Sequence, residues 1–222
     1  MPIPLITPVT AKTINHLNPD AGILLNTFDF YTATDAYTLM ELVKAAIGTD
    51  KCFGATKGGI NVPEGRENWS PTFDSKRMRY KGETFFAGAA PKVSGSLVEF
   101  TPKNVKAVSG AADITGDGTR KVKVQPRASI HLDDYFENVV FITNNGPNGL
   151  YLVELKNALC TVGMNSQSTD KDVSTMPFEF TAHSTSPEFT DELPISYYFF
   201  GVSEEATAAV ANEQQGEEAA EG

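Results

Sequence analysis

Short segments rich in β-branched and aromatic residues recur along the chain, and they predict a mainly β protein. Clusters of Gly, Pro, Asn and Asp separate the segments, as expected for strands joined by turns. The predicted strands are residues 23–28, 52–56, 93–100, 121–125, 139–143, 150–156, 176–183 and 195–202. The sequence NNGPNG at 144–149 supplies the positive-φ residues of a hairpin loop between the fifth and sixth segments.

One longer segment has helical rather than strand periodicity. Thr34 is the predicted N-cap, and Gly48 lies where a left-handed residue ends a helix. The apolar stripe between them has the spacing of a buried helix face and consists of Ala36, Leu39, Met40, Val43 and Ile47.

A second, shorter helix is predicted near the middle of the chain. Thr101 is its cap, Pro102 its first residue and Gly110 its end, with Val105 and Val108 facing inward. Two helices beside these segments predict a β-sandwich or barrel of about eight strands with one or two flanking helices.

The strands differ in how many of their faces are apolar. In 176–183, Phe178 and Phe180 alternate with polar residues, so one face of this strand is core and the other is wet. The runs 139–142, 150–153 and 197–200 are apolar on both faces. Two short helices cover part of such a surface, and we expect a neighbouring subunit to cover the remainder.

Residues 58–80 form a long segment with little periodicity, which is typical of functional loops. It contains the only tryptophan, together with other aromatic and arginine residues of the kinds enriched at interfaces: Trp69, Phe73, Arg77 and Tyr80. Two interpretations stay open: a loop folded back over its own core, and an arm that docks on another subunit.

Acidic residues are concentrated at the C-terminal end. The chain has 28 acidic and 18 basic residues, which gives a formal net charge of −10. Residues 203–222 contain six Glu and no Lys or Arg, so the net charge of residues 1–202 is −4. We therefore expect one β domain, 1–202, with the long loop 58–80 inserted, and an acidic mobile tail, 203–222. The tail is either a solubilising appendage or an interaction segment. The acidic balance argues against a protein that grips phosphates.

Motifs for catalysis or cofactor binding are absent from the sequence, and we expect no enzyme, no cofactor and no metal site. His131, Asp133 and Asp134 are the main acid/base candidates, but a glycosidase pair comes from facing strands rather than adjacent positions. Residues 113–118 resemble the first half of a calcium loop, yet Val124 occupies the position of its bidentate Glu. A tight turn before the strand 121–125 is the better interpretation. Cys52 and Cys160 have no metal-ligand spacing, so we expect reduced packing cysteines.

The first ten residues have neither the basic region nor the apolar stretch of a signal peptide. The longest apolar runs fall far short of the roughly 20 residues that span a bilayer. We therefore expect a protein that is made and kept in the cytoplasm, with no membrane partner.

Four blocks in shared order resemble the major tail tube protein of long-tailed bacteriophages. They are GATKGGINV (54–62), VSGSLVEFTPKNVKAVSGAADI (93–114), LYLVELKNALCTVGMNSQSTDKD (150–172) and TMPFEFTAH (175–183). The resemblance implies a β-sandwich or barrel flanked by a helix, with a fold similar to the type VI secretion tube. It also implies hexameric rings of this chain that stack into a hollow virion tube for DNA, assembled in the host cytoplasm with other tail proteins.

Under this resemblance, two groups of residues become candidates for the tube. Acidic residues on the wet faces of strands would line the lumen and repel passing double-stranded DNA rather than bind it: Glu99, Glu154 and Glu179. The ring-stacking interface would use Trp69, Phe73, Arg77 and Tyr80.

Three other functions stay open. A carbohydrate-binding β-sandwich module would use Trp69, Tyr80 and Tyr151 as a platform for sugar rings. A hydrolase would use Asp133 and Asp134. A tail terminator or a capsid decoration protein would share the self-association of a tube subunit.

Overall fold

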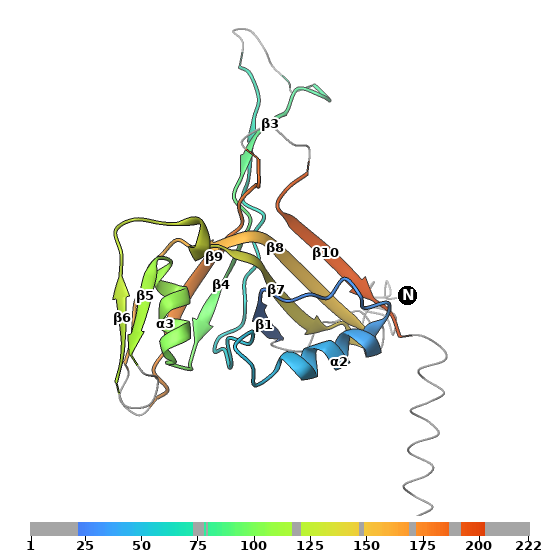
Figure 1. Cartoon of the computed structure of the whole chain (residues 1–222). Helices are drawn as coiled ribbons and strands as arrows, with labels where there is room; N and C mark the ends of the chain where they lie inside the picture. Colours follow the sequence, from blue (N-terminus) through green and yellow to red (C-terminus); the bar gives the residue numbers. More distant parts are fainter. Residues whose placement is uncertain are drawn as a thin grey trace, which may run out of the picture. The chain divides into compact units, whose positions relative to one another are not determined.

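A computed structural model describes residues 22–72, 78, 80–116, 121–146, 149–168, 172–186 and 192–202, and Figure 1 labels their helices and strands. These residues form antiparallel sheets and two helices, so the prediction of a mainly β protein is confirmed. The predicted tail 203–222 lies outside the described residues.

The largest sheet has six strands, in the order β1-β7-β8-β9-β4, with β10 paired to β8. Among the described residues this path does not close into a barrel. The strands are β1 (Ile23–Asn26), β4 (Lys92–Leu97), β7 (Phe136–Asn144), β8 (Leu150–Cys160), β9 (Met176–Thr181) and β10 (Ile195–Phe200). Each corresponds to a predicted strand. The predicted segment 52–56 instead forms only isolated bridges, Leu25 to Cys52 and Thr56 to Leu97.

Two further sheets are two-stranded hairpins. β2 (Arg66–Trp69) pairs with β3 (Phe85–Ala89), and β5 (Ala112–Gly116) pairs with β6 (Val122–Pro126). The segment 113–118 thus begins in a strand, as the turn interpretation requires, although the turn itself lies outside the described residues. The long segment 58–80 also contains a strand, β2, which its weak periodicity did not predict.

The chain divides into two compact units, a division that the sequence analysis did not anticipate. Unit 1 comprises Met1–Cys52, Val140–Val153 and Tyr197–Gly222, and unit 2 comprises Phe53–Val139 and Glu154–Ser196. Strands β7, β8 and β10 contribute residues to both units. Because the units interleave along the chain, no boundary between them is visible as a linker.

Helix α2 (Ala36–Ala46) belongs to unit 1 and begins one residue later than predicted. Its cap is Asp35, not Thr34: Asp35 Oδ1 accepts from the Thr38 amide at 2.8 Å, and Thr38 Oγ1 accepts from the Asp35 amide at 3.1 Å. This reciprocal pair satisfies two amides that the helix start leaves free. Met40 and Ile47 of the predicted stripe are exposed to solvent, by 40% and 50%, whereas Leu39 and Val43 are buried.

The core of unit 1 forms where α2 packs on strands of the sheet. Its buried cluster consists of Leu25, Phe28, Phe30, Leu39, Val43, Ala46, Val140, Ile142 and Leu152. The loop between β7 and β8 has Gly146 and Gly149 at positive φ, and Asn145 donates to Gly149 O at 2.9 Å. The predicted hairpin between these strands is therefore confirmed.

Helix α3 (Pro102–Ser109) belongs to unit 2 and starts and ends as predicted. Thr101 Oγ1 accepts from the Asn104 amide at 3.1 Å, and Gly110 follows the helix at φ 77°. The inward face differs from the prediction, because Asn104, Ala107 and Val108 are buried while Val105 is half-buried. A separate aromatic core in this unit joins Phe53, Phe136, Phe178 and Phe180.

Candidate assembly surfaces

The hairpin β2–β3, called the ribbon below, exposes three large aromatic side chains of unit 2. Trp69 lies opposite Phe85 in the register, and their ring centroids are 5.9 Å apart. Asn68 lies opposite Phe86, so this aromatic residue faces the other side of the ribbon. Trp69 is 59% exposed, Phe85 52% and Phe86 42%. An apolar two-stranded hairpin with both faces in water is marginally stable alone, which favours a partner for it.

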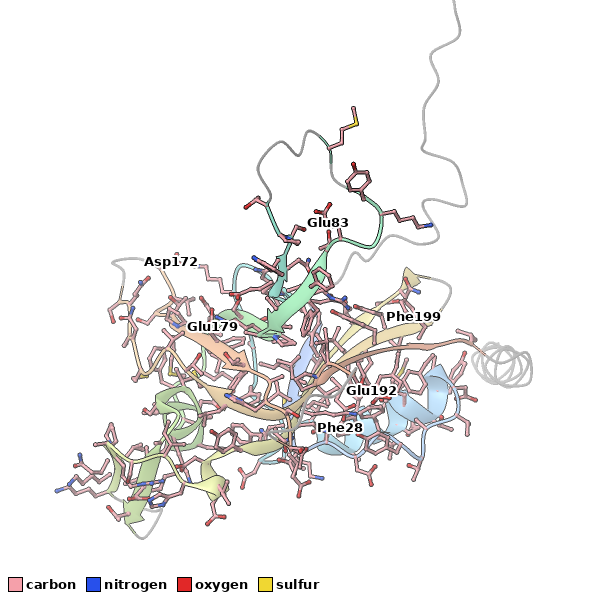
Figure 2. All side chains as sticks on the ribbon, turned by 90° about the horizontal axis from the view of Figure 1, so that it is seen from above. Phe28, Glu83, Asp172, Glu179, Glu192 and Phe199 are labelled. Carbon is pink, nitrogen blue, oxygen red and sulfur yellow. The ribbon has the colours of Figure 1, made fainter. Side chains whose placement is uncertain are left out.

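The ribbon continues beyond its strands toward the loop that holds the other predicted interface residues. Ser70 Oγ and Thr84 Oγ1 are 3.2 Å apart, and the Tyr80 amide donates to Glu83 Oε2 at 2.8 Å (Figure 2). Tyr80 is mostly exposed, as Trp69 is. Phe73 and Arg77, also predicted here, lie outside the described residues.

Strand β10 presents aromatic side chains on both of its faces. Tyr198 and Phe200 point into the core of unit 1, where their rings meet Phe30 edge-on at 5.0 and 6.5 Å. Tyr197 and Phe199 alternate with them on the other face. There, the ring centroids of Tyr197 and Phe199 lie 6.3 and 4.9 Å from the ring centroid of Tyr151 in β8. Tyr151, Tyr197 and Phe199 form a surface that we call the aromatic strip. Phe199 is 71% exposed.

The other two doubly apolar runs do not behave in the same way. Val139, Val140, Phe141 and Ile142 are all buried, and so are Leu152 and Val153 of the run 150–153. The expectation that a neighbouring subunit covers the run 139–142 is therefore wrong, because the chain itself covers it. In the run 150–153, Leu150 and Tyr151 are half-buried, and Tyr151 joins the aromatic strip with residues of the run 197–200.

Glu154 does not lie on a wet face. Its side chain is 1% exposed, and Asn138 Nδ2 donates to its Oε1 at 3.2 Å. The neighbours Val153 and Leu155 are also buried, so this part of β8 is enclosed on both faces. The expected solvent exposure of Glu154 is wrong for this chain, and with it the ground for placing Glu154 in a lumen.

The remaining acidic candidates are accessible to different degrees. Glu179 of β9 is partly exposed and forms an ion pair with Lys92 Nζ at 2.8 Å, so a cation offsets its charge (Figure 2). Glu99 is exposed, and its Oε1 accepts from the Ala55 amide at 2.8 Å. A Cβ on Gly54 would lie within 2.4 Å of this carboxylate, so only glycine permits the close approach.

One of the acid/base candidates, Asp134, belongs to an ion-pair cluster in unit 2. Asp134 is buried, and Arg127 Nη2 donates to its Oδ1 at 2.6 Å while the His131 amide donates to its Oδ2 at 2.8 Å. Arg127 also donates to Asp113 at 3.0 Å. Oδ2 of Asp134 thus caps its own short 3₁₀ turn, Leu132–Asp134, while Oδ1 ties this turn through Arg127 to Asp113 of the hairpin β5–β6. These contacts give the Asp134 carboxylate a structural role. The neighbouring Asp133 is exposed.

Two open hollows lie in unit 2. The first, of about 570 Å³, lies between residues 57–61 and strands β4 and β9. Beside it, Lys57 Nζ donates to both oxygens of Asp172 at 2.5 and 2.6 Å, and this hydrogen bonding lowers the pKa of the Asp172 carboxyl, helped by the Val173 amide (Figure 2). The second, of about 470 Å³, contains His183, whose Nδ1–H donates to Asn157 O at 3.1 Å.

The residues named for a sugar platform fall in different units of the chain. Trp69 and Tyr80 belong to unit 2, whereas Tyr151 belongs to unit 1 and joins the aromatic strip. Among the described residues, no three His, Cys, Asp or Glu side chains gather as possible metal ligands. No helix in the same residues is long and apolar enough to cross a membrane.

Comparisons with known proteins do not extend this picture. Neither a protein-family model nor a curated protein matches the chain. Its function must therefore be inferred from its own surfaces.

Proposed function

We propose that the chain is a structural subunit of a virion, the major tail tube protein, which assembles as hexameric rings stacked into a hollow channel for DNA. A sandwich-like arrangement of its sheets belongs to the same proposal. The observation that carries it is the exposure of aromatic side chains on paired strands, on the ribbon and on the aromatic strip. Strand surfaces of this kind invite association with further strands or sheets.

The exposed aromatic residues support self-association rather than chemistry. Trp and Tyr are among the residue types most enriched at the energetic centres of interfaces, and the ribbon exposes 59% of Trp69. Asp134, the buried member of the candidate acid/base group, is occupied by Arg127 and a backbone amide. Its role is accounted for without a substrate.

An acidic chain also suits a conduit for DNA. A wall of basic residues would neutralise phosphates and retain the nucleic acid, whereas an anionic or neutral wall repels it. After the burial of Glu154, the acidic lumen candidates are Glu99 and Glu179. In an infectious particle, Glu179→Lys should leave tubes assembled and slow genome ejection; normal ejection would remove this residue from the lumen.

Electron microscopy of the purified full chain at rising concentration tests the proposal. We expect rings and hollow rods of constant diameter at high concentration. Trp69→Ala should raise the concentration at which rods appear while the circular dichroism spectrum stays unchanged. Dispersed single copies at every concentration, with normal folding, would contradict the assignment.

A carbohydrate-binding module is the second candidate, and one observation favours it. The rings of Tyr151 and Tyr197 are within 6° of parallel, which suits stacking against a flat sugar face. This function predicts a monomer whose migration on glycan affinity gels is retarded, and whose retardation is lost in Tyr197→Ser.

A further inference from the structure

The second hollow, of about 470 Å³, lies wholly within unit 2 and is lined mainly by hydrogen-bonding side chains. Its polar lining consists of Lys156, Asn157, His183, Ser184, Thr185, Ser186 and Glu192. We propose that this hollow binds a small tetrahedral oxyanion with two negative charges, of the phosphate or sulfate class, and that His183 makes the binding stronger at lower pH. The inference is independent of the proposed function, because it requires neither assembly nor DNA.

The hydrogen bonds of His183 define what its ring offers to a ligand. Its Nδ1 lies 3.1 Å from Asn157 O, and because a carbonyl oxygen only accepts, Nδ1 carries a proton. The charge of the ring therefore changes at Nε2, which accepts a hydrogen bond in neutral histidine and donates one in the protonated form. Within the described residues Nε2 has no hydrogen-bond partner. The Tyr135 ring packs edge-on at a centroid distance of 5.2 Å and helps to fix the imidazole.

Asn157 holds the segment that carries these groups. It adopts φ 48° within strand β8, a conformation that few residues other than glycine take. Its Nδ2 donates to His183 O at 3.2 Å and to Thr185 Oγ1 at 2.9 Å. Glycine would take this φ without strain but would lose both side-chain bonds. Strained backbone that is held by such contacts is typical of functional sites.

The groups in the hollow that have no partner are mostly hydrogen-bond donors. In the described part of the chain, neither Lys156 Nζ nor Ser184 Oγ forms a hydrogen bond or an ion pair. Thr185 Oγ1 accepts from Asn157, so its hydroxyl proton stays available to donate. Glu192 is the only acid in the lining, and it already interacts with another group of the chain. An ammonium and two hydroxyls, joined by Nε2–H at lower pH, are partners for the oxygens of an anion.

Charge and size indicate the class of ligand. The formal net charge of −10 opposes a long polyanion such as a nucleic acid, but not a small anion at one local site. Ligand pockets measure about 300–1,000 Å³, so the hollow is large enough for a phosphate ester as well as for a free ion. Lys156 supplies one positive charge, and His183 adds a second only when it is protonated. Binding should therefore weaken as the pH rises.

Titration with sulfate at constant ionic strength tests the site in the full chain. Histidine changes its charge between about pH 5 and 8, whereas sulfate keeps both negative charges over this range, so any change in affinity reports the protein. We expect saturable binding of one sulfate per chain, followed through the His183 ring signals in NMR spectra. The Kd should be about tenfold higher at the upper end of this pH range, because a charge-assisted hydrogen bond is lost.

Three variants separate the contributions. His183→Asn removes Nε2 but keeps an amide that can donate to Asn157 O, so it should fold normally, bind sulfate about tenfold more weakly at low pH and lose the pH dependence. Lys156→Met should weaken binding throughout the range and keep the pH dependence. His131→Asn is the matched control, because His131 is exposed and does not line the hollow, and it should bind as the wild type does.

Two phosphate ligands distinguish the possible sources of the anion. Tighter binding of glycerol phosphate than of inorganic phosphate would support the site and indicate an ester, and equal binding would support it and indicate the free ion. Three results would overturn the inference. They are His183 signals that show no saturable shift with sulfate, a folded Lys156→Met variant with wild-type affinity, and a folded His183→Asn variant that keeps the pH dependence.

Discussion

Asn104 of helix α3 offers the most direct test of how unit 2 is held together. Its side chain is 2% exposed, and its Nδ2 donates both of its hydrogens, to Phe53 O and to Glu99 O, each at 2.9 Å. These two carbonyls belong to segments far apart from each other in the sequence. The amide group therefore ties the start of α3 to the chain that enters unit 2 and to the end of β4.

We expect Asn104→Leu, which keeps the number of side-chain heavy atoms but removes both donors, to destabilise the protein by about 2–4 kcal/mol. The bond to Phe53 O is buried, so losing it leaves an unsatisfied acceptor at a cost of about 1–3 kcal/mol. The bond to Glu99 O is only partly buried, and water compensates for it, so its loss costs about 1 kcal/mol. For a chain of this size, each kcal/mol shifts the melting temperature by about 2–4 °C.

Thermal and urea unfolding followed by circular dichroism will measure the change. Asn61→Leu is the matched control, because the side chain of Asn61 is exposed and should alter the free energy of unfolding by less than about 0.5 kcal/mol. An Asn104→Leu variant as stable as the wild type would show that these two hydrogen bonds do not hold α3 in place.

Further variants probe the loops, an ion pair and the buried acid. Gly149→Ala should destabilise by about 2 kcal/mol or more in thermal melts, since φ is 115° and a Cβ would lie 1.9 Å from a backbone oxygen, whereas Gly88→Ala should be neutral. Lys57→Met should raise the lowered pKa of Asp172 toward its ordinary value in an NMR titration. Because the pKa of Asp172 is lowered in the folded state, the ion pair stabilises the fold at pH values above the ordinary carboxyl pKa of about 4. This contribution is lost as the pH falls through the lowered pKa of the folded state. Glu154→Lys should lower the free energy of unfolding, measured in urea, by about 3–5 kcal/mol, because the side chain at position 154 is buried. A variant as stable as the wild type would show that this side chain reaches solvent.

Local signals in the sequence predicted most helices and strands. Features that depend on contacts with distant parts of the chain were not predicted. Thr101, Pro102 and Gly110 defined α3 correctly, because caps and turns depend on neighbouring residues only. Strand β2 has the polar sequence RENW, and its conformation depends on pairing with β3, which lies beyond a long loop. The burial of Asn104 likewise depends on two distant carbonyls, so a helical stripe built from Val105 and Val108 could not include it.

The candidate site shows the same division. Trp69 on the ribbon and Tyr80 in the connection between its strands are exposed, and their residue types favoured an interface, but the aromatic strip was not predicted as a surface. Its members come from two strands, and only the fold shows that Tyr151 meets Tyr197 and Phe199. The prediction that Glu154 is exposed to solvent failed for a related reason. A polar residue in an apolar strand indicates a solvent-facing position unless a buried hydrogen-bond partner satisfies it, and only the fold shows that Asn138 is such a partner.

The apolar runs show why exposed surface, rather than composition, should set the strength of assembly. Periodicity reports how many faces of a strand are apolar, but not whether the same chain covers them. Val139 to Ile142 are covered by the chain itself, so they add to folding and contribute nothing to association. What remains for partners is the outer face of β10 and the ribbon, a modest area for a stable interface. Single contacts between copies should therefore be weak and easily reversed, and long assemblies should appear only above a threshold concentration at which each copy makes several contacts at once.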